Sequence, residues 1–177
     1  MSLVDVYLGL GSNIEREAHL CAGLDALFEL FGELRCSPVF ESEPVGIRSD
    51  CFLNLVVHFK TAMPLQRLNQ HLKQIESING RYAQPRRGLT LDIDVLLYEQ
   101  HVGVFGDVIL PRAEILKNAF VLWPLSILAP QVLHPVEQCS FLQLWQQTPI
   151  EQNLWPHAFV WRGQDLTPVH LLKASAV

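Results

Sequence analysis

One short stretch, residues 90–98, limits the possible folds of this chain more than any other. Its apolar side chains and its polar, glycine- and proline-containing flank predict a β-strand. Because side chains two residues apart share a face of a strand, Asp92 and Asp94 are expected to project together. Neighbouring carboxylates in a mostly apolar strand repel each other and are costly to desolvate. A divalent cation relieves both costs, and this pair suits Mg²⁺ with water and phosphate completing its shell. The opposite face is expected to carry Ile93, Val95 and Leu97.

An arbitrary Asp-x-Asp pair more often lies on an exposed edge strand, where solvent surrounds both aspartates. Here three arginines precede the strand, namely Arg81, Arg86 and Arg87. Carboxylates beside arginines fit a polyphosphate and its metal better than they fit bare solvent. We therefore predict a metal site at Asp92 and Asp94.

The apolar patterns before this strand predict the order β-α-β-β-α-β. The first helix ends at Gly32, with Ser12 or Asn13 as its expected cap, and the second runs from Pro64 to Asn79. Two helices on one face of a four-stranded antiparallel sheet form the ferredoxin-like arrangement of the α+β class. The four strands are expected at residues 3–10, 34–43, 51–61 and 90–98.

Beyond residue 98 the pattern is weaker. We expect a hairpin over residues 102–110, a short helix after Pro111 and an apolar segment at 119–125. A helix around Leu142 and Trp145 and an added strand over 155–161 are expected in the tail. The chain of 177 residues is expected to form a single domain (1–177), with a core at about 3–135 and a C-terminal extension at 136–177. Composition assigns no function to this extension.

The third predicted strand carries two polar residues in an apolar run. Asn54 either satisfies neighbouring backbone groups or, beside Phe52, presents a donor and an acceptor to a heterocycle, and both interpretations stay open. His58 has no evident partner in the sequence, and we interpret it as a structural strand residue.

Composition excludes several classes of protein. A net charge of −5 argues against general nucleic-acid binding, and 49% hydrophobic residues with 18% charged residues indicate a globular chain. No stretch is long enough to span a membrane. The cysteines are widely separated, without a Cys-x-x-Cys pair, so we expect reduced structural thiols in a cytoplasmic protein. They are Cys21, Cys36, Cys51 and Cys139.

Seven short motifs, each weak alone, occur in a specific order over about residues 3–135. They lie at residues 10–13, 42–46, 52–54, 76 with 80–81, 90–94, 110–111 and 120–125. In this order and at nearly this spacing they resemble those of the 6-hydroxymethyl-7,8-dihydropterin pyrophosphokinases, enzymes of folate biosynthesis.

The resemblance implies transfer of a diphosphate from ATP to the hydroxymethyl group of the pterin, with release of AMP. Asp92 and Asp94 match the positions that hold two Mg²⁺ ions, and Arg81 matches a phosphate-contacting arginine. Glu76 matches a nucleotide-side position. The implied pterin pocket has two aromatic rings on either side of the pterin and four further positions. These residues are Phe52, Phe120, Ser42, Val45, Gly46 and Asn54.

Three positions depart from the family pattern. Leu89 and Asn118 stand where arginines are expected, and Arg112 stands where a histidine is expected. We expect Arg86, Arg87 and Arg112 to bind the nucleotide from displaced positions. The partners implied are the pterin and ATP alone, bound by a monomer, without nucleic acid or membrane.

Two other functions remain open at this point. The chain could be a catalytically impaired paralogue that binds a pterin or a nucleotide, which is motivated by Leu89 and Asn118. It could also be a nucleotidyltransferase, because those enzymes combine a Gly-Ser turn with a later Asp-x-Asp. In them the two motifs lie close together, whereas here Gly11 and Asp92 are separated by most of the domain.

Overall fold

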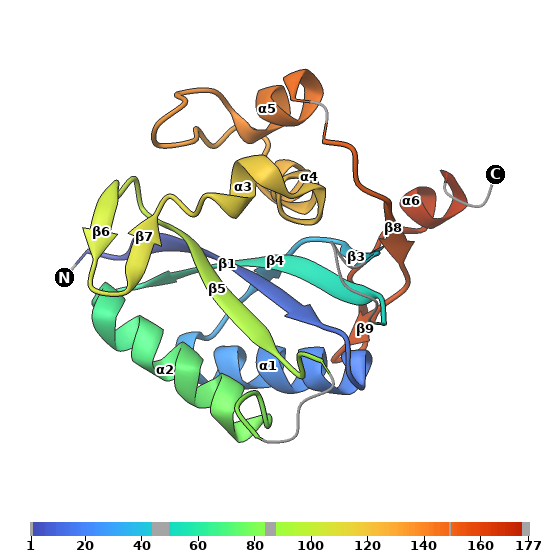
Figure 1. Cartoon of the computed structure of the whole chain (residues 1–177), viewed down its shortest axis with the longest axis horizontal. Coiled ribbons are helices and arrows are strands. Elements are labelled where there is room, and N and C mark those ends of the chain that lie inside the picture. The colour runs from blue at the N-terminus through green and yellow to red at the C-terminus, as the bar shows by residue number, and fades with distance from the viewer. Residues whose placement is uncertain (1, 44–49, 84–87, 149, 175–177) are drawn as a thin grey trace.

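The computed structural model describes residues 2–43, 50–83, 88–148 and 150–174. At its centre is an antiparallel sheet with helices on both faces (Figure 1). The sheet order is β5-β1-β4-β3-β8, with β2 also paired to β4. Its strands are β1 (Val4–Ser12), β2 (Arg35–Cys36), β3 (Val39–Ser42), β4 (Phe52–Thr61), β5 (Asp92–Tyr98) and β8 (Leu154–His157).

Two helix layers cover the two faces of the sheet (Figure 1). Helices α1 (Arg16–Phe31) and α2 (Leu65–Ile78) lie on one face, and α3 (Glu114–Lys117), α4 (Ala119–Leu128) and α5 (Phe141–Gln147) lie on the other. Each layer encloses an apolar core. Strand β1 serves both, because Val6 and Leu8 face the α1–α2 layer while Tyr7 faces the α4–α5 layer.

The predicted ferredoxin-like arrangement is confirmed. The four strands of the βαββαβ unit lie in the order β5-β1-β4-β3, and all of their pairings are antiparallel. The predicted single strand at 34–43 is instead two strands, separated at Ser37 and Pro38. Proline has no N–H to donate. Here the Ser37 hydroxyl accepts a hydrogen bond of 2.8 Å from the Val56 N–H.

Strand β5 begins at Asp92, two residues later than predicted, and contains an irregularity. Its register with β1 shifts between the pairs Tyr7–Leu97 and Leu8–Val95, which leaves Leu96 as an extra residue. The prediction that Leu97 shares a face with Ile93 and Val95 is therefore wrong. Leu97 packs in the α4–α5 layer, whereas Ile93 and Val95 pack in the α1–α2 layer.

The structure adds a partner for His58 and shows that the predicted cap of the first helix is wrong. His58 does have a partner, because its Nε2 lies 2.7 Å from Asp5 Oδ1 on the neighbouring strand. Neither Ser12 nor Asn13 caps α1, which has no side-chain cap. Asn13 instead binds the backbone of Leu89: its Oδ1 accepts from Leu89 N at 2.6 Å, and its own N–H donates to Leu89 O at 3.0 Å.

The rest of the chain forms a hairpin and a long tail. The predicted hairpin consists of β6 (Gly103–Phe105) and β7 (Val108–Leu110), and the apolar segment at 119–125 is helical, as part of α4. The predicted helix near Leu142 is α5. The predicted strand at 155–161 is two strands: β8 at the edge of the main sheet and β9 (Val160–Trp161), which pairs with β10 (Gln164–Asp165). Helix α6 (Val169–Ala174) follows.

Two expectations from composition agree with the structure. All four cysteines carry free thiols, and burial raises the pKa of Cys36 to about 12. Within the described residues, every helix is too short or too polar to cross a membrane.

Candidate active site

Strands β1 and β5 bring the two aspartates to one cavity. Asp92 lies opposite Gly11 and Asp94 opposite Gly9 in the β1–β5 ladder. Both side chains line a cavity of about 400 Å³ and are only about one-third exposed, at 30% and 31%. A side chain at Gly11 would place its Cβ 2.6 Å from Asn54 Oδ1, so only glycine fits there without displacing Asn54. The expectation that the carboxylates project together agrees with this geometry.

The pair is electrostatically costly without a cation. Burial, the charge of Asp92 and a hydrogen bond with Asp92 raise the pKa of Asp94 to about 8, although Arg112 acts in the opposite direction. Among the described residues, no group of three or more His, Cys, Asp or Glu side chains could hold a metal. A metal here would therefore take two protein carboxylates and complete its shell with other oxygens, which is a common arrangement for Mg²⁺ beside phosphates.

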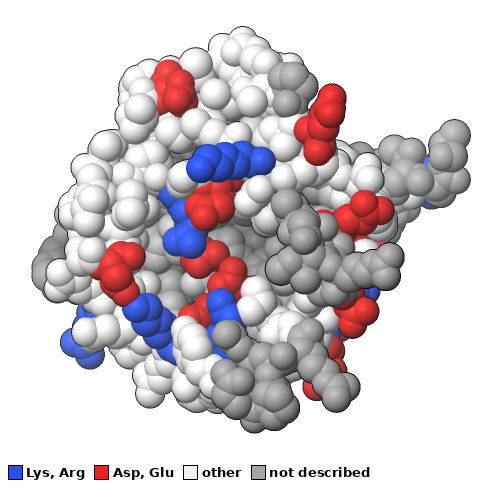
Figure 2. All heavy atoms as spheres, viewed as in Figure 1, with Lys and Arg blue, Asp and Glu red and all other residues white. Residues whose placement is uncertain are grey.

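Two arginines flank the carboxylates. Arg81, three residues after α2, places a terminal nitrogen 3.5 Å from Asp92 Oδ1. Arg112, after β7, places one 3.3 Å from Asp94 Oδ1, and its Nε lies 3.2 Å from Glu114 Oε2. Figure 2 shows acidic side chains along the hollow at the centre of this face, with basic side chains beside them. Arg86 and Arg87 lie outside the described residues.

A second pocket, with mostly apolar walls, adjoins the carboxylates, and we call it the neutral pocket although Glu43 and Asp92 are among its lining residues. Its volume is about 260 Å³, and it shares Gly11, Asn54, Asp92 and Phe120 with the first cavity. The Asn54 side chain is buried, and its Nδ2 donates a 3.1 Å hydrogen bond to the Ser42 hydroxyl. This leaves polar atoms of a buried pair beside two aromatic rings, those of Phe52 on β4 and Phe120 on α4.

The neutral pocket therefore unites four of the predicted pterin residues. Ser42, Phe52, Asn54 and Phe120 all line it, together with Glu43 and Leu89. Val45 and Gly46, the other two predicted pterin residues, lie outside the described residues.

A third cavity, of about 210 Å³, lies on the other side of the aspartates. It shares Arg81, Asp92, Asp94 and Arg112 with the first cavity and extends to Asn69, Lys73 and Asp107.

Glu76, predicted on the nucleotide side, also lines this third cavity. Both oxygens of its buried carboxylate bind protein donors: Oε2 accepts from Ile93 N at 2.9 Å, and Oε1 accepts from Tyr82 Oη at 2.7 Å.

Glu76 thus holds the backbone between the two aspartates. Burial raises the pKa of Glu76, while its hydrogen bonds from Ile93 and Tyr82 lower it. The sequence analysis missed Glu114, which no local pattern marks, and it assigned Asn13 to a helix cap and not to the backbone at Leu89. Glu114 contacts Arg112, and Asn13 fixes the chain at Leu89 just before β5.

Comparison with known proteins gives one consistent family. Residues 7–130 match the model of the 7,8-dihydro-6-hydroxymethylpterin-pyrophosphokinase (HPPK) family. The chain belongs to this family. It is 33% identical over 137 residues to the 2-amino-4-hydroxy-6-hydroxymethyldihydropteridine pyrophosphokinase of Aquifex aeolicus, covering 76% of this chain and 86% of that protein. The enzyme of the same name from Pseudomonas aeruginosa is 36% identical over 136 residues, covering 73% of this chain and 83% of that one.

Solved structures support the same fold. The crystal structure of wild-type Plasmodium falciparum HPPK-DHPS superposes with a TM-score of 0.66 at 15% identity. The match covers 93% of this chain and 50% of the Plasmodium chain, so this chain spans about half the length of that protein.

The three departures from the pyrophosphokinase pattern now have positions. Leu89 lines the neutral pocket, and Asn118 lines the first cavity, where its Oδ1 accepts a 3.1 Å hydrogen bond from Gln152. Neither supplies positive charge. Arg112 stands beside Asp94 and, with Arg81, gives the described part of the first cavity two guanidinium groups.

Proposed function

We propose that this chain is an active 6-hydroxymethyl-7,8-dihydropterin pyrophosphokinase. It transfers a diphosphate from ATP to the hydroxymethyl oxygen of the pterin and releases AMP. The observation that carries this proposal is the position of the carboxylate pair: Asp92 lines the aromatic pocket, and both Asp92 and Asp94 line the arginine-flanked cavities. A flat heterocycle beside Asp92 and a polyphosphate beside both carboxylates would therefore occupy adjoining spaces.

Asp92 and Asp94 are the proposed ligands of two Mg²⁺ ions. The raised pKa of Asp94 supports this assignment, because a carboxylate that is disfavoured as a bare anion gains most from a bound cation. When bound, the metal ions neutralise phosphate charge and align the reacting oxygens.

The two arginines are proposed to bind phosphate oxygens. In the structure, Arg81 and Arg112 each contact one of the aspartates. A cation that occupies the carboxylates leaves these guanidinium groups to donate hydrogen bonds to the negatively charged phosphates. Arg86 and Arg87 are proposed to act on the same side.

The neutral pocket is proposed to hold the pterin. Phe52 and Phe120 provide aromatic faces, which favour stacking on a flat ring. Asn54 and Ser42 provide a buried amide and hydroxyl for the polar edge of the ring, and Val45 and Gly46 are proposed to complete this edge. Because Asp92 lines the same pocket, a ring held there lies next to the carboxylate pair.

Product analysis tests the reaction. Purified chain, ATP, Mg²⁺ and 6-hydroxymethyl-7,8-dihydropterin are expected to give AMP and the pterin diphosphate in equal amounts, separated by chromatography. Release of ADP alone would make the chain an ordinary kinase, and release of pyrophosphate would make it a nucleotidyltransferase. Either result overturns the proposal.

An impaired paralogue is the second candidate, favoured by the uncharged side chains of Leu89 and Asn118. Its signature is tight pterin binding in calorimetry without AMP release after long incubation. We further propose that the chain acts as a cytoplasmic monomer and that residues 1–177 form one domain. Sedimentation at one molecular mass and a single cooperative unfolding transition are the expected results.

A further inference from the structure

The segment 150–157 lies beyond the residues matched by the family model, yet it reaches three sides of the neutral pocket. We propose that Gln152 and Trp155 are positioning residues, which act through other side chains to set the shape of the pterin pocket. The inference rests on the proposed function in taking the pterin as the occupant of this pocket.

The first contact is an added strand. In the β3–β8 ladder, Ser42 pairs with Leu154 and Glu41 pairs with Trp155. Beyond it, Glu43 N donates to Asn153 O at 3.2 Å, and Asn153 Nδ2 donates to Glu43 Oε2 at 3.0 Å. The end of β3, which carries Ser42 into the pocket, is thus held between β4 and the segment 150–157, which we call the tail.

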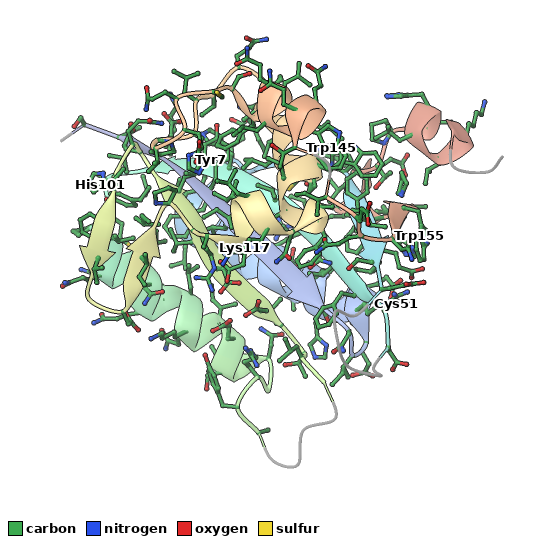
Figure 3. All side chains as sticks on the ribbon, turned by 45° about the horizontal axis from the view of Figure 1, so that its top comes forward. Tyr7, Cys51, His101, Lys117, Trp145 and Trp155 are labelled. Atoms are coloured by element: carbon green, nitrogen blue, oxygen red, sulfur yellow. The ribbon has the colours of Figure 1, made fainter. Side chains whose placement is uncertain are left out.

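The second contact is a chain of hydrogen bonds from Trp155 to the start of β4. Trp155 Nε1 donates to Glu41 Oε1 at 3.0 Å, and Glu41 Oε2 lies 2.6 Å from an Arg16 nitrogen. That nitrogen also donates to the Cys51 carbonyl at 3.1 Å. Figure 3 shows Trp155 and Cys51 on the same side of the molecule.

This chain of bonds ends one residue before Phe52, a wall of the pocket. The side chains of Arg16 and Glu41 are 23% and 19% exposed, so the ion pair is shielded more than a surface pair. A change at Trp155 therefore reaches the backbone that places Phe52.

The third contact caps helix α4. Gln152 Oε1 accepts a 2.8 Å hydrogen bond from the N–H of Ala119, the first residue of α4. Gln152 Nε2 donates to Asn118 Oδ1 at 3.1 Å. Helix α4 has no side-chain cap from its own N-cap residue, so the tail supplies this acceptor. Phe120, the second residue of α4, is the other aromatic wall of the pocket.

These contacts reach Ser42, Phe52 and Phe120, and in the first cavity only the uncharged Asn118, whereas Asp92 and Asp94 are held by β1, Glu76 and two arginines. Loss of the tail contacts is therefore expected to weaken pterin binding while leaving ATP binding nearly unchanged. A merely structural role would lower stability and affect both substrates alike.

The test uses the full chain with Trp155→Phe and, separately, Gln152→Met. Trp155→Phe removes the N–H donor and keeps an aromatic ring, and Gln152→Met removes the cap at similar length. Each is expected to raise the KM for the pterin about tenfold, with the KM for ATP and kcat within about twofold. The matched control is Trp161→Phe, which removes the comparable bond from Trp161 Nε1 to Asp25 Oδ1, away from the pocket, and is expected to change neither KM.

Several results would overturn the inference. They are an unchanged pterin KM in both variants, equal changes in both KM values, or an equal effect of Trp161→Phe. Calorimetry with the pterin alone separates the two proposals. If the parent chain binds pterin but does not turn over, the proposed function fails while the variants still test the tail. If the parent chain turns over and the variants bind pterin normally, only the inference fails.

Discussion

The two halves of the site differ in how the fold holds them. The charged half, which carries Asp92 and Asp94, is built from the adjacent strands β1 and β5, with Glu76 bonded to the backbone between the aspartates. The neutral half is built from β3, β4 and α4, whose positions also depend on Gln152 and Trp155. The charged half uses elements within residues 7–130, whereas the neutral half also takes support from outside them.

The difference shows that the fold places a charged group and shapes a ligand pocket through different kinds of contact. A carboxylate pair needs only two positions on one strand and acts through a cation. A pocket for a flat ring needs several walls at fixed separations, and in this protein the walls come from three elements tied together by the tail. Mutations can therefore test the halves separately.

The largest expected effect is at Asp94. Asp94→Ala is expected to lower Mg²⁺-dependent kcat about a thousandfold or more, because a preorganised electrostatic contact to the reacting phosphates is lost. Pterin binding by calorimetry should stay within about threefold, and the circular dichroism spectrum should be unchanged. Near-normal turnover would show that Asp94 is not a metal ligand. Loss of pterin binding would show that the two halves of the site are not independent.

A second effect is pH-dependent stability, measured without metal by urea unfolding in EDTA. The folded-state pKa of Asp94 is raised from 3.8 to about 8, so its protonated form favours the folded chain. That contribution is fully present below pH 3.8 and is lost as the pH rises toward 8.

The parent chain should therefore lose several kcal/mol, with about 5 kcal/mol as the upper bound, relative to Asp94→Asn between pH 4 and pH 8. Excess Mg²⁺ should restore most of this difference at pH 8. Parallel stability curves for the two proteins would contradict the assigned electrostatics.

Glu76→Ala addresses the support of the charged half. The substitution leaves the N–H of Ile93 without its acceptor in a buried position, and we expect a loss of about 1–3 kcal/mol in unfolding free energy. Tyr82→Phe is the control, because it removes only the bond to Glu76 Oε1 from a residue that is 53% exposed. Equal losses of unfolding free energy in both variants would show that the hydrogen bond from Ile93 N to Glu76 contributes little to stability.

The sequence predicts the charged half better than the neutral half for a physical reason. Strand alternation at Asp92 and Asp94 is a local property, and so is the helical spacing of the two helices that cover one face. The shift at Leu96 depends on pairing with another strand, and no local pattern encodes it, whereas Pro38 marks the break after Ser37 in the sequence itself. The contacts of Gln152 and Trp155 join residues 33 and 114 positions apart, so they become visible only in the fold.

The smallest expected effect is a gain. Leu89 lines the neutral pocket three residues before Asp92, and the Asn13 side chain fixes its backbone. An arginine at this position would start from a held backbone and carry positive charge toward the phosphates beside the aspartates. Leu89→Arg is expected to raise kcat about threefold to tenfold, far below the full value of a transition-state arginine, because Arg81 and Arg112 already line the cavity.

Leu89→Gln separates charge from side-chain length. If the glutamine variant is equally fast, the gain comes from shape in the neutral half and not from charge. If Leu89→Arg leaves the rate unchanged, Arg86 or Arg87 already supplies the charge that the family takes from this position. A raised KM for the pterin with an unchanged rate would place residue 89 in the neutral half, because its side chain would then act on the ring and not on the phosphates.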